Sequence, residues 1–226
     1  MKTTLLKLAL GLTVAAMGAM PAGAGDYGGG LKGLRGSYVP VPAPHPIPDY
    51  RAKWYLRGDL GVIPQWLGWG SSAMQFLIGV VLIGLALREA VPGRAVPPGA
   101  AVGALVLGFA FQLAVSVATW VASPGPAFSW AGFTGGVVCM RNEITFALPA
   151  LIVTLWLVVR ALPLRPAMAG AFGGTGAGLV ADGINHLLCP MSDLRHVVAW
   201  HTGAVLLLAL AGWLAGSLWE RARRPS

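Results

Sequence analysis

The chain has 226 residues, of which 56% are hydrophobic and only 11% are charged, and its mean hydropathy is +0.69. A soluble domain carries about 25% charged residues, so this chain has too few polar side chains to cover a water-facing surface. Its formal net charge is +8. Most arginines flank apolar segments, where they set topology and bind anionic lipid rather than nucleic acid. We therefore predict an integral membrane protein with lipid as a partner and no nucleic-acid partner.

The first 24 residues have the features of a secretory signal peptide. Lys2 and Lys7 flank a short basic start, and an apolar run follows over 8–20. Ala22-Gly23-Ala24 then has the small-x-small pattern of a signal-peptidase site. An uncleaved anchor is the alternative. Both versions place the following residues outside the cytoplasm.

Residues 25–71 predict an extended, Pro- and Gly-rich periplasmic segment. Proline stands at every second position from Pro40 to Pro48, which fixes φ, removes donors and favours polyproline II. Residues 53–62 then alternate as in a half-buried strand. The run Tyr55-Leu56-Arg57-Gly58-Asp59-Leu60-Gly61 resembles the first strand of small outer-membrane β-barrel proteins. No further alternating strands follow, so we do not expect a barrel.

From Ser72 onward the pattern is helical and apolar. About 20 residues suffice to cross a hydrocarbon core. Residues 127–138 are glycine-rich and aromatic, and they predict an interfacial or re-entrant loop with Trp130 at headgroup level. The predicted fold class is all-α, an integral membrane bundle with five transmembrane helices. The predicted spans are 72–91, 100–122, 143–162, 167–188 and 197–219. The predicted domains are the signal peptide 1–24, the periplasmic segment 25–71 and the transmembrane domain 72–226.

Arginines indicate the orientation of these spans. With the residues before the first span outside, the turns after the first and third spans fall in the cytoplasm, as does the C-terminus. Arg141 and Arg195 lie in the outer loops between spans. This asymmetry agrees with the positive-inside rule and predicts a multi-pass inner-membrane protein with its N-terminal segment in the periplasm. The cytoplasmic arginines are Arg88, Arg94, Arg160, Arg165, Arg221, Arg223 and Arg224.

The only two cysteines are Cys139 and Cys189. The two spans between them form a hairpin, so both thiols return to one membrane face. On the periplasmic side a disulfide can persist. The pair is therefore predicted to be a structural disulfide or a thiol switch that reacts with an oxidant or a soft metal ion. No resident cofactor is predicted, only transient soft-metal binding. A permanent metal site with His186 is less favoured, because the C-x-x-C pairs of structural zinc sites are lacking.

Further polar residues gather near the same face. Asp182 and His186 are four residues apart on one helical face, Glu143 opens the third span, and His201 lies near the start of the fifth. Ionisable residues at membrane depth indicate function by default, so these side chains are predicted to support the thiol pair. We predict no enzyme, because no oxyanion donor or orienting motif accompanies the cysteines. Without charged residues at mid-helix, a transporter is also disfavoured.

Gly170, Gly174 and Gly178 recur at every fourth residue of the fourth span. This spacing lets helix backbones approach closely in lipid. Packing inside one bundle is the favoured prediction, and a homodimer interface is the alternative.

Several motifs occur in a characteristic order. A first helix ends in Ala86-Leu87-Arg88-Glu89-Ala90-Val91-Pro92-Gly93-Arg94, Cys139 precedes a helix with Leu148-Pro149, and the sequence continues with His186-x-x-Cys189-Pro190 and Val198-Ala199-Trp200-His201-Thr202-Gly203. From about residue 75 the chain thereby resembles the NrsF-type family of membrane anti-sigma factors.

This resemblance implies a six-helix inner-membrane protein whose cytoplasmic N-terminal segment holds an extracytoplasmic-function sigma factor. Cys139 and Cys189 are then the stress-sensing pair. Here the signal peptide and the leader stand where that segment and the first helix are expected. We predict a regulator that senses redox or heavy-metal stress but lacks the usual sigma-binding N-terminus. The alternative is a fusion protein whose helical domain is only a membrane anchor.

Overall fold

The computed structural model describes residues 65–122, 130–189 and 193–223, and every regular element within these ranges is a helix. The all-α prediction is confirmed for this part of the chain. The predicted signal peptide, the proline-rich segment and the predicted strand over 53–62 lie outside the described residues. The elements are α2 (Gln65–Ala90), α3 (Pro98–Ala122), α4 (Trp130–Arg160), α5 (Pro166–Leu188), α6 (Leu194–His196), the π-helix η2 (Val197–Thr202) and α7 (Gly203–Arg223).

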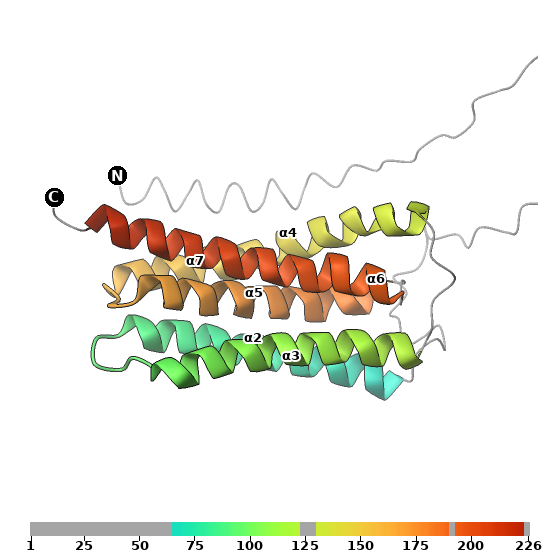
Figure 1. The fold of residues 1–226 in the computed structure, drawn as a ribbon, viewed down its shortest axis with the longest axis horizontal. Coiled ribbons are helices and arrows are strands. Elements are labelled where there is room, and N and C mark those ends of the chain that lie inside the picture. Colours follow the sequence, from blue (N-terminus) through green and yellow to red (C-terminus); the bar gives the residue numbers. More distant parts are fainter. Residues whose placement is uncertain (1–64, 123–129, 190–192, 224–226) are drawn as a thin grey trace, which may run out of the picture. The chain divides into compact units, whose positions relative to one another are not determined.

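The helices form two hairpins and one further continuous run (Figure 1). Residues 91–97 connect α2 to α3, and residues 161–165 connect α4 to α5. The run of α6, η2 and α7 follows. Both hairpin turns and the C-terminal end of α7 lie at one end of the bundle, and α6 lies at the other (Figure 1). The two ends of the bundle therefore carry different parts of the sequence, as the predicted up-and-down order requires.

The glycine-rich helix α5 occupies the centre of the bundle between α2 and α7. Sixteen of its 23 residues are buried. A Cβ atom on Gly176 would lie 2.6 Å from the carbonyl oxygen of Gly79 in α2, and one on Gly170 would lie 2.0 Å from that of Gly212 in α7. Glycine at these crossings therefore lets the backbones touch, which replaces side-chain interdigitation in lipid.

The glycine stripe singled out in the sequence faces α7 of the same chain. A Cβ atom on Gly174 would lie 2.1 Å from the carbonyl oxygen of Leu208, and one on Gly178 would lie 3.0 Å from Cα of Val205. Together with the Gly170 crossing, these contacts extend along three successive turns of α5. This face of α5 is therefore covered inside the bundle.

Two predicted helix starts are wrong. The first helix, α2, begins at Gln65 rather than at Ser72. The loop predicted over 127–138 is helical from Trp130 onward, so α4 has 31 residues. A Cβ atom on Gly136 would lie 1.9 Å from the Trp200 ring, which shows that glycine there serves close helix packing rather than a loop.

Within the described ranges, four helices are long and apolar enough to cross a membrane. They are Gly68–Ala90, Pro98–Ala122, Phe133–Arg160 and Leu194–Arg223. The fifth predicted span, α5, has a sufficient length of 23 residues but is not among them, because its many glycines and its polar residues lower its hydropathy. Its buried position reduces its need for an apolar surface.

Exposure in this bundle is the reverse of that in a soluble protein. Large apolar side chains such as Leu107 and Val121 are 71% and 67% exposed. Polar side chains such as Gln75, Gln112 and Glu143 are at most 1% exposed. An apolar exterior around a polar interior is the arrangement expected when lipid is the solvent, and the chain is a membrane protein on this ground.

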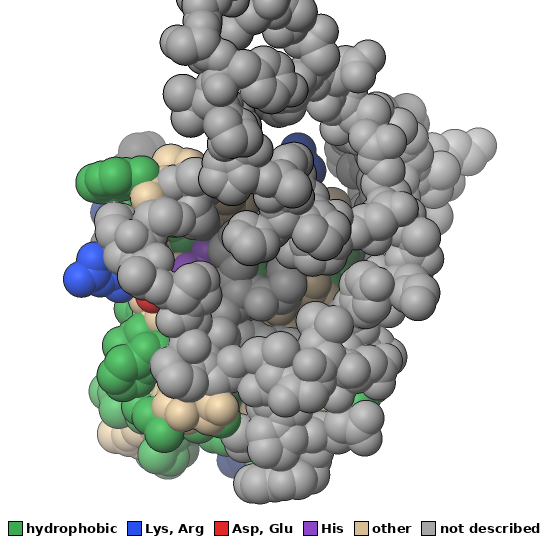
Figure 2. All heavy atoms as spheres, turned by 90° about the vertical axis from the view of Figure 1, so that its right-hand side faces the viewer, with side chains coloured by type: hydrophobic (Ala, Val, Ile, Leu, Met, Phe, Trp, Pro, Cys, Tyr) green, Lys and Arg blue, Asp and Glu red, His purple; other side chains and the backbone are tan. Residues whose placement is uncertain are grey.

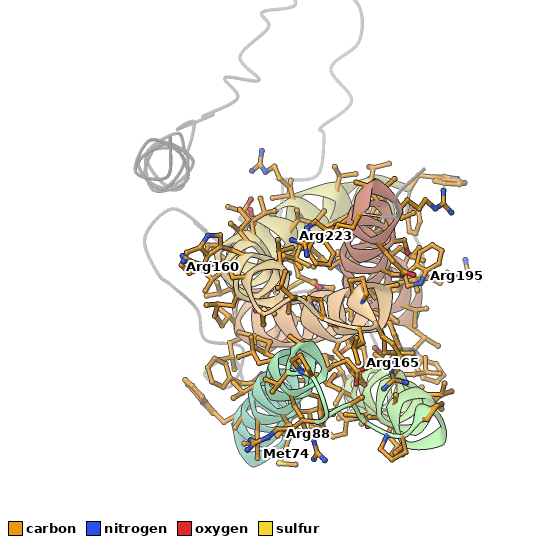
Figure 3. All side chains as sticks on the ribbon, turned by 90° about the vertical axis from the view of Figure 1, so that its left-hand side faces the viewer. Met74, Arg88, Arg160, Arg165, Arg195 and Arg223 are labelled. Carbon is orange, nitrogen blue, oxygen red and sulfur yellow. The ribbon has the colours of Figure 1, made fainter. Side chains whose placement is uncertain are left out.

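The end of the bundle with the two hairpin turns carries a buried ion pair, and we refer to it as the arginine end. Arg88, Arg160, Arg165 and Arg223 gather there (Figure 3). Nε of Arg165 lies 2.6 Å from a carboxylate oxygen of buried Glu89, and the other oxygen accepts a hydrogen bond from the Val96 N–H at 2.8 Å. Arg165 also donates to the Val96 carbonyl. These bonds join the two hairpin turns.

Candidate thiol and histidine site

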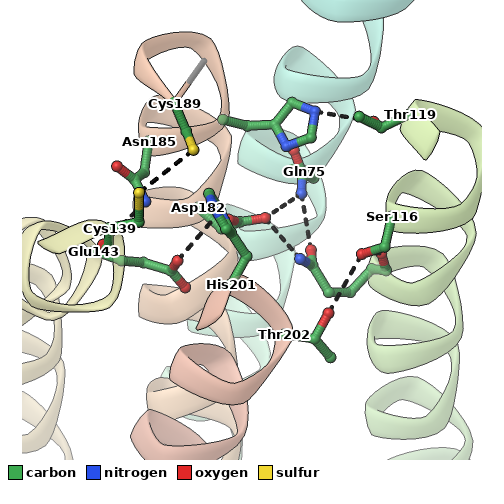
Figure 4. A network of polar contacts seen from close by, with 12 residues as sticks. Gln75, Ser116, Thr119, Cys139, Glu143, Asp182, Asn185, Cys189, His201 and Thr202 are labelled. Carbon is green, nitrogen blue, oxygen red and sulfur yellow. Dashed lines mark hydrogen bonds and ion pairs between the residues drawn. The ribbon is translucent and has the colours of Figure 1, made fainter. Parts of the chain in front are cut away.

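The opposite end of the bundle holds both thiols. Cys139 lies inside α4, and Cys189 directly follows the last turn of α5. They form no disulfide with each other, and their Sγ atoms lie 3.4 Å apart. The prediction that the hairpin brings the two thiols together is confirmed. Nδ2 of Asn185 donates to the Cys139 carbonyl at 3.1 Å, which ties the two helices beside the sulfur atoms (Figure 4).

A first histidine reaches the thiols from α6. Asp193 caps this short helix, because its Oδ1 accepts a hydrogen bond from the His196 N–H at 3.1 Å. Nε2 of His196 lies 3.4 Å from Sγ of Cys189. His196 itself is only 2% exposed. Figure 2 looks onto this end of the molecule, where histidine and acidic atoms are visible.

A second histidine, His201, comes from the π-helix η2. Here the Gly203 N–H bonds the carbonyl of Val198, five residues earlier, and such π-turns are frequent at functional sites. The ligand atoms of Cys139, Cys189, His196 and His201 all lie within 4.8 Å of one another. We call these four residues the thiol–histidine cluster.

A carboxylate lies behind His201, on the side toward the bundle centre. Asp182 Oδ1 accepts from Nδ1 of His201 at 2.6 Å. Its Oδ2 accepts from Nε2 of Gln75 at 2.5 Å and from Nε2 of Gln112 at 2.7 Å. A buried carboxylate needs such donors, and these come from α2, α3 and η2. Asp182 therefore connects the cluster to both helices of the first hairpin (Figure 4).

Glu143 also belongs to this polar interior. Its Oε2 lies 3.7 Å from Nδ1 of His201, and its side chain is fully buried. The sequence suggested that Glu143 opens a span, whereas it lies well inside α4. A transporter was disfavoured from the sequence because the predicted spans have no charged residue at mid-helix. That premise is wrong.

His186 is not a member of the thiol–histidine cluster. Its Nε2 lies 3.1 Å from the Thr119 hydroxyl of α3, and it groups with Asp182 and His201 instead. The histidines that lie with the two cysteines are thus His196 and His201.

The surroundings of Cys189 favour the thiolate. Its hydrogen bond with Cys139 lowers the pKa of the Cys189 thiol well below the usual value, although burial acts in the opposite direction. The thiolate is the form that attacks oxidants and binds soft metal ions. Two thiols at this distance can therefore either close to a disulfide or share a metal ion.

The family model NrsF, described as negative regulator of sigma F, matches residues 54–221. The chain belongs to the NrsF family. Comparisons with curated proteins and with solved structures gave no match.

In this NrsF-family chain the matched region includes every described helix up to Arg221 and all members of the thiol–histidine cluster. It begins well before residue 75, where the sequence resemblance starts. It therefore also includes residues 54–71, which the sequence assigns to the leader. The likeness of the leader to outer-membrane proteins stays a prediction.

For this NrsF-family chain, the sequence analysis did not predict that three further residues belong to the site. Gln75 and Gln112 are amides inside the apolar stretches of α2 and α3, and a polar residue at membrane depth was the available signal. His196 follows Cys189 by seven residues in the sequence. Its place beside the thiols depends on the capped turn of α6, which composition does not predict.

Proposed function

We propose that this chain is an inner-membrane regulator of an extracytoplasmic-function sigma factor, which it binds and then releases when Cys139 and Cys189 react with an oxidant or a soft metal ion. The observation that supports this most is the meeting of the two thiols inside a region that matches the NrsF family. The family supplies the sigma-factor partner, and the thiol pair supplies a reactive group. An enzymatic role forms no part of this proposal.

We further propose that α5 crosses the membrane with the four apolar helices. Its buried position allows a less apolar surface, and its ends coincide with those of its neighbours in Figure 1. With five crossings, the arginine end faces the cytoplasm by the positive-inside rule and the thiols face the periplasm. The sigma factor would then bind the hairpin turns and the C-terminal end of α7, because the leader is predicted to be exported.

Co-purification tests the proposal. The tagged full-length chain is extracted from membranes with each candidate sigma factor co-expressed, before and after exposure of the cells to diamide or cadmium. We expect one sigma factor to co-purify and to be lost after exposure. With Cys139→Ser or Cys189→Ser, that sigma factor should stay bound after exposure.

Two results would contradict the proposal. If no sigma factor co-purifies with intact protein, the helical domain is only a membrane anchor. If the cysteine variants release the sigma factor as the unaltered chain does, the thiols are not the sensor. The same cells report the topology, because a membrane-impermeant thiol reagent should label Cys139 without permeabilisation once reductant is present.

A further inference from the structure

Two histidines at the thiols remain without a role if the pair only forms a disulfide. His196 and His201 are 2% and 1% exposed. Nδ1 of His201 bonds Asp182, and the ring also contacts Cys189. Buried polar nitrogen atoms cost free energy unless they have partners, and at this end of the bundle the thiols are among those partners. A metal ion is a partner that all four residues of the cluster can share.

We propose that Cys139, Cys189, His196 and His201 form a four-ligand site for a divalent d¹⁰ cation, Zn²⁺ or Cd²⁺. This inference rests on the proposed function and deepens it, because it names the ligand that the thiol pair senses. Sulfur and imidazole nitrogen in a four-ligand set are the donors that such ions prefer.

The distances between the donor atoms fit such a site. Metal–sulfur bonds of about 2.3 Å and metal–nitrogen bonds of about 2.0–2.1 Å place the ligand atoms of a tetrahedron roughly 3.4–3.8 Å apart. The two sulfur atoms are 3.4 Å apart, and so are Sγ of Cys189 and Nε2 of His196. The whole set lies within 4.8 Å. Shifts of side chains alone can therefore close the site.

The contact between Asp182 and His201 resembles the outer shell of known metal sites. An ionised carboxylate only accepts hydrogen bonds, so Nδ1 of His201 donates to Asp182 over 2.6 Å. In the neutral imidazole this leaves the lone pair on Nε2. A ligating histidine almost always donates its other N–H to a carboxylate or carbonyl in this way. Gln75 and Gln112 hold that carboxylate in turn.

Charge balance favours a divalent ion. Binding of one M²⁺ displaces one proton from Cys139 and a second that Cys189 and His201 share, so the complex of two thiolates, two neutral imidazoles and the ion has no net charge. This suits a buried position, where an unbalanced charge is costly. A monovalent ion on two thiolates would leave one negative charge and would leave both histidines unused.

The test uses the full-length chain, purified in detergent under reducing conditions and loaded with Cd²⁺ or with Co²⁺ as a spectroscopic probe. We expect one ion per chain, cadmium–thiolate absorption in the ultraviolet, and the intense visible bands of four-coordinate Co²⁺. X-ray absorption of the Zn²⁺ form, which needs no mutation, should show two sulfur and two nitrogen neighbours.

Variants identify the ligands. His196→Ala and His201→Ala should each weaken Cd²⁺ binding at least about tenfold. Cys139→Ser should reduce the thiolate absorption, and replacing both cysteines by serine should abolish it. Arg160→Ala is the control, since Arg160 lies in the last turn of α4 at the opposite end of the bundle, and it should bind as the unaltered chain does. Circular dichroism confirms that each variant keeps its helices.

Sulfur-only coordination, or unchanged affinity in both histidine variants, would overturn the four-ligand site. The proposed function fails separately. If metal binds to all four ligands but the sigma factor stays bound, the site stands and the sensing role does not. If diamide releases the sigma factor but no metal binds, the sensing role stands and the site does not.

Discussion

The two ends of the bundle each bury a carboxylate, but they balance its charge with different partners. At the arginine end, Glu89 pairs with the guanidinium of Arg165 and with one backbone N–H. At the thiol end, Asp182 is held by two side-chain amides and an imidazole. An arginine stays protonated under all physiological conditions, whereas an imidazole exchanges its proton and binds metal ions.

The Glu89–Arg165 ion pair, which we call the clamp, therefore differs from the Asp182–His201 pair, in which the imidazole can exchange its proton or bind a metal ion. Glu89, Val96 and Arg165 join two hairpin turns through an ion pair and two hydrogen bonds to the Val96 backbone. His201 lies between Asp182 and the thiols, and Asp182 in turn accepts hydrogen bonds from Gln75 and Gln112. The side chains of this end therefore come from α2, α3, α4, α5 and η2.

The largest stability effect is expected at the arginine end. Arg165→Ala leaves the Glu89 carboxylate buried without a counter-charge, which typically costs 3–5 kcal/mol. One third of the Arg165 side chain is exposed (33%), so we expect about 3 kcal/mol, measured as the loss of unfolding free energy in detergent. Adding Glu89→Gln should recover much of this loss.

Arg160→Ala is the matched control for Arg165→Ala. Arg160 lies at the same end but stacks on exposed Trp156, with its Cζ 4.9 Å from the ring centroid, which is worth at most about 1 kcal/mol. Equal losses in the two variants would show that the buried pair has no special role. Cd²⁺ affinity should be unchanged in both, because neither residue touches the thiol end.

The sequence predicts some features of the two bundle ends better than others. Helix lengths determine which ends meet, so the hairpin between Cys139 and Cys189 and the gathering of arginines were accessible from composition and spacing. The glycine spacing likewise predicted close packing of α5.

Composition and spacing do not predict which single polar residues are buried. Arg141-Asn142-Glu143 has the composition of a helix start in water. Glu143 is nonetheless buried, because Asp182 and His201, about 40 and 60 residues later in the sequence, provide its polar surroundings. Likewise the π-helix at Val197–Thr202 leaves no periodic signal over so few residues. Such features depend on tertiary partners, not on local pattern.

A smaller effect on stability is expected for Asp182→Asn at the thiol end, where the variant should mainly change Cd²⁺ affinity. Asparagine keeps one oxygen for the glutamine donors but loses the charge that orients His201. We expect Cd²⁺ affinity to fall about 10–100-fold, while the helices stay folded. Equilibrium titration with Cd²⁺ measures the affinity, and the unfolding free energy of the metal-free protein is measured alongside.

Glu143→Gln is the control for Asp182→Asn. Its carboxylate lies 3.7 Å from the same nitrogen of His201, whereas Asp182 lies 2.6 Å away. Hydrogen bonding requires the shorter distance, so Glu143→Gln should lower the affinity less than tenfold. If the two variants lose affinity equally, general electrostatics rather than the Asp182 hydrogen bond positions His201.

The smallest effect is expected for Gln112→Leu, which removes the α3 amide that holds Asp182. The variant loses the hydrogen bonds of Gln112 to Asp182 and to Gln75, at 2.7 Å and 2.8 Å. Interhelical hydrogen bonds in membranes average about 0.6 kcal/mol each, so we expect a loss of about 1 kcal/mol in unfolding free energy. Leu113→Ala, at the neighbouring exposed position, should change little. A loss well above 1 kcal/mol would mean that the Asp182 network is as rigid as the Glu89–Arg165 clamp. In that case the arginine end and the thiol end would not differ in the way proposed above.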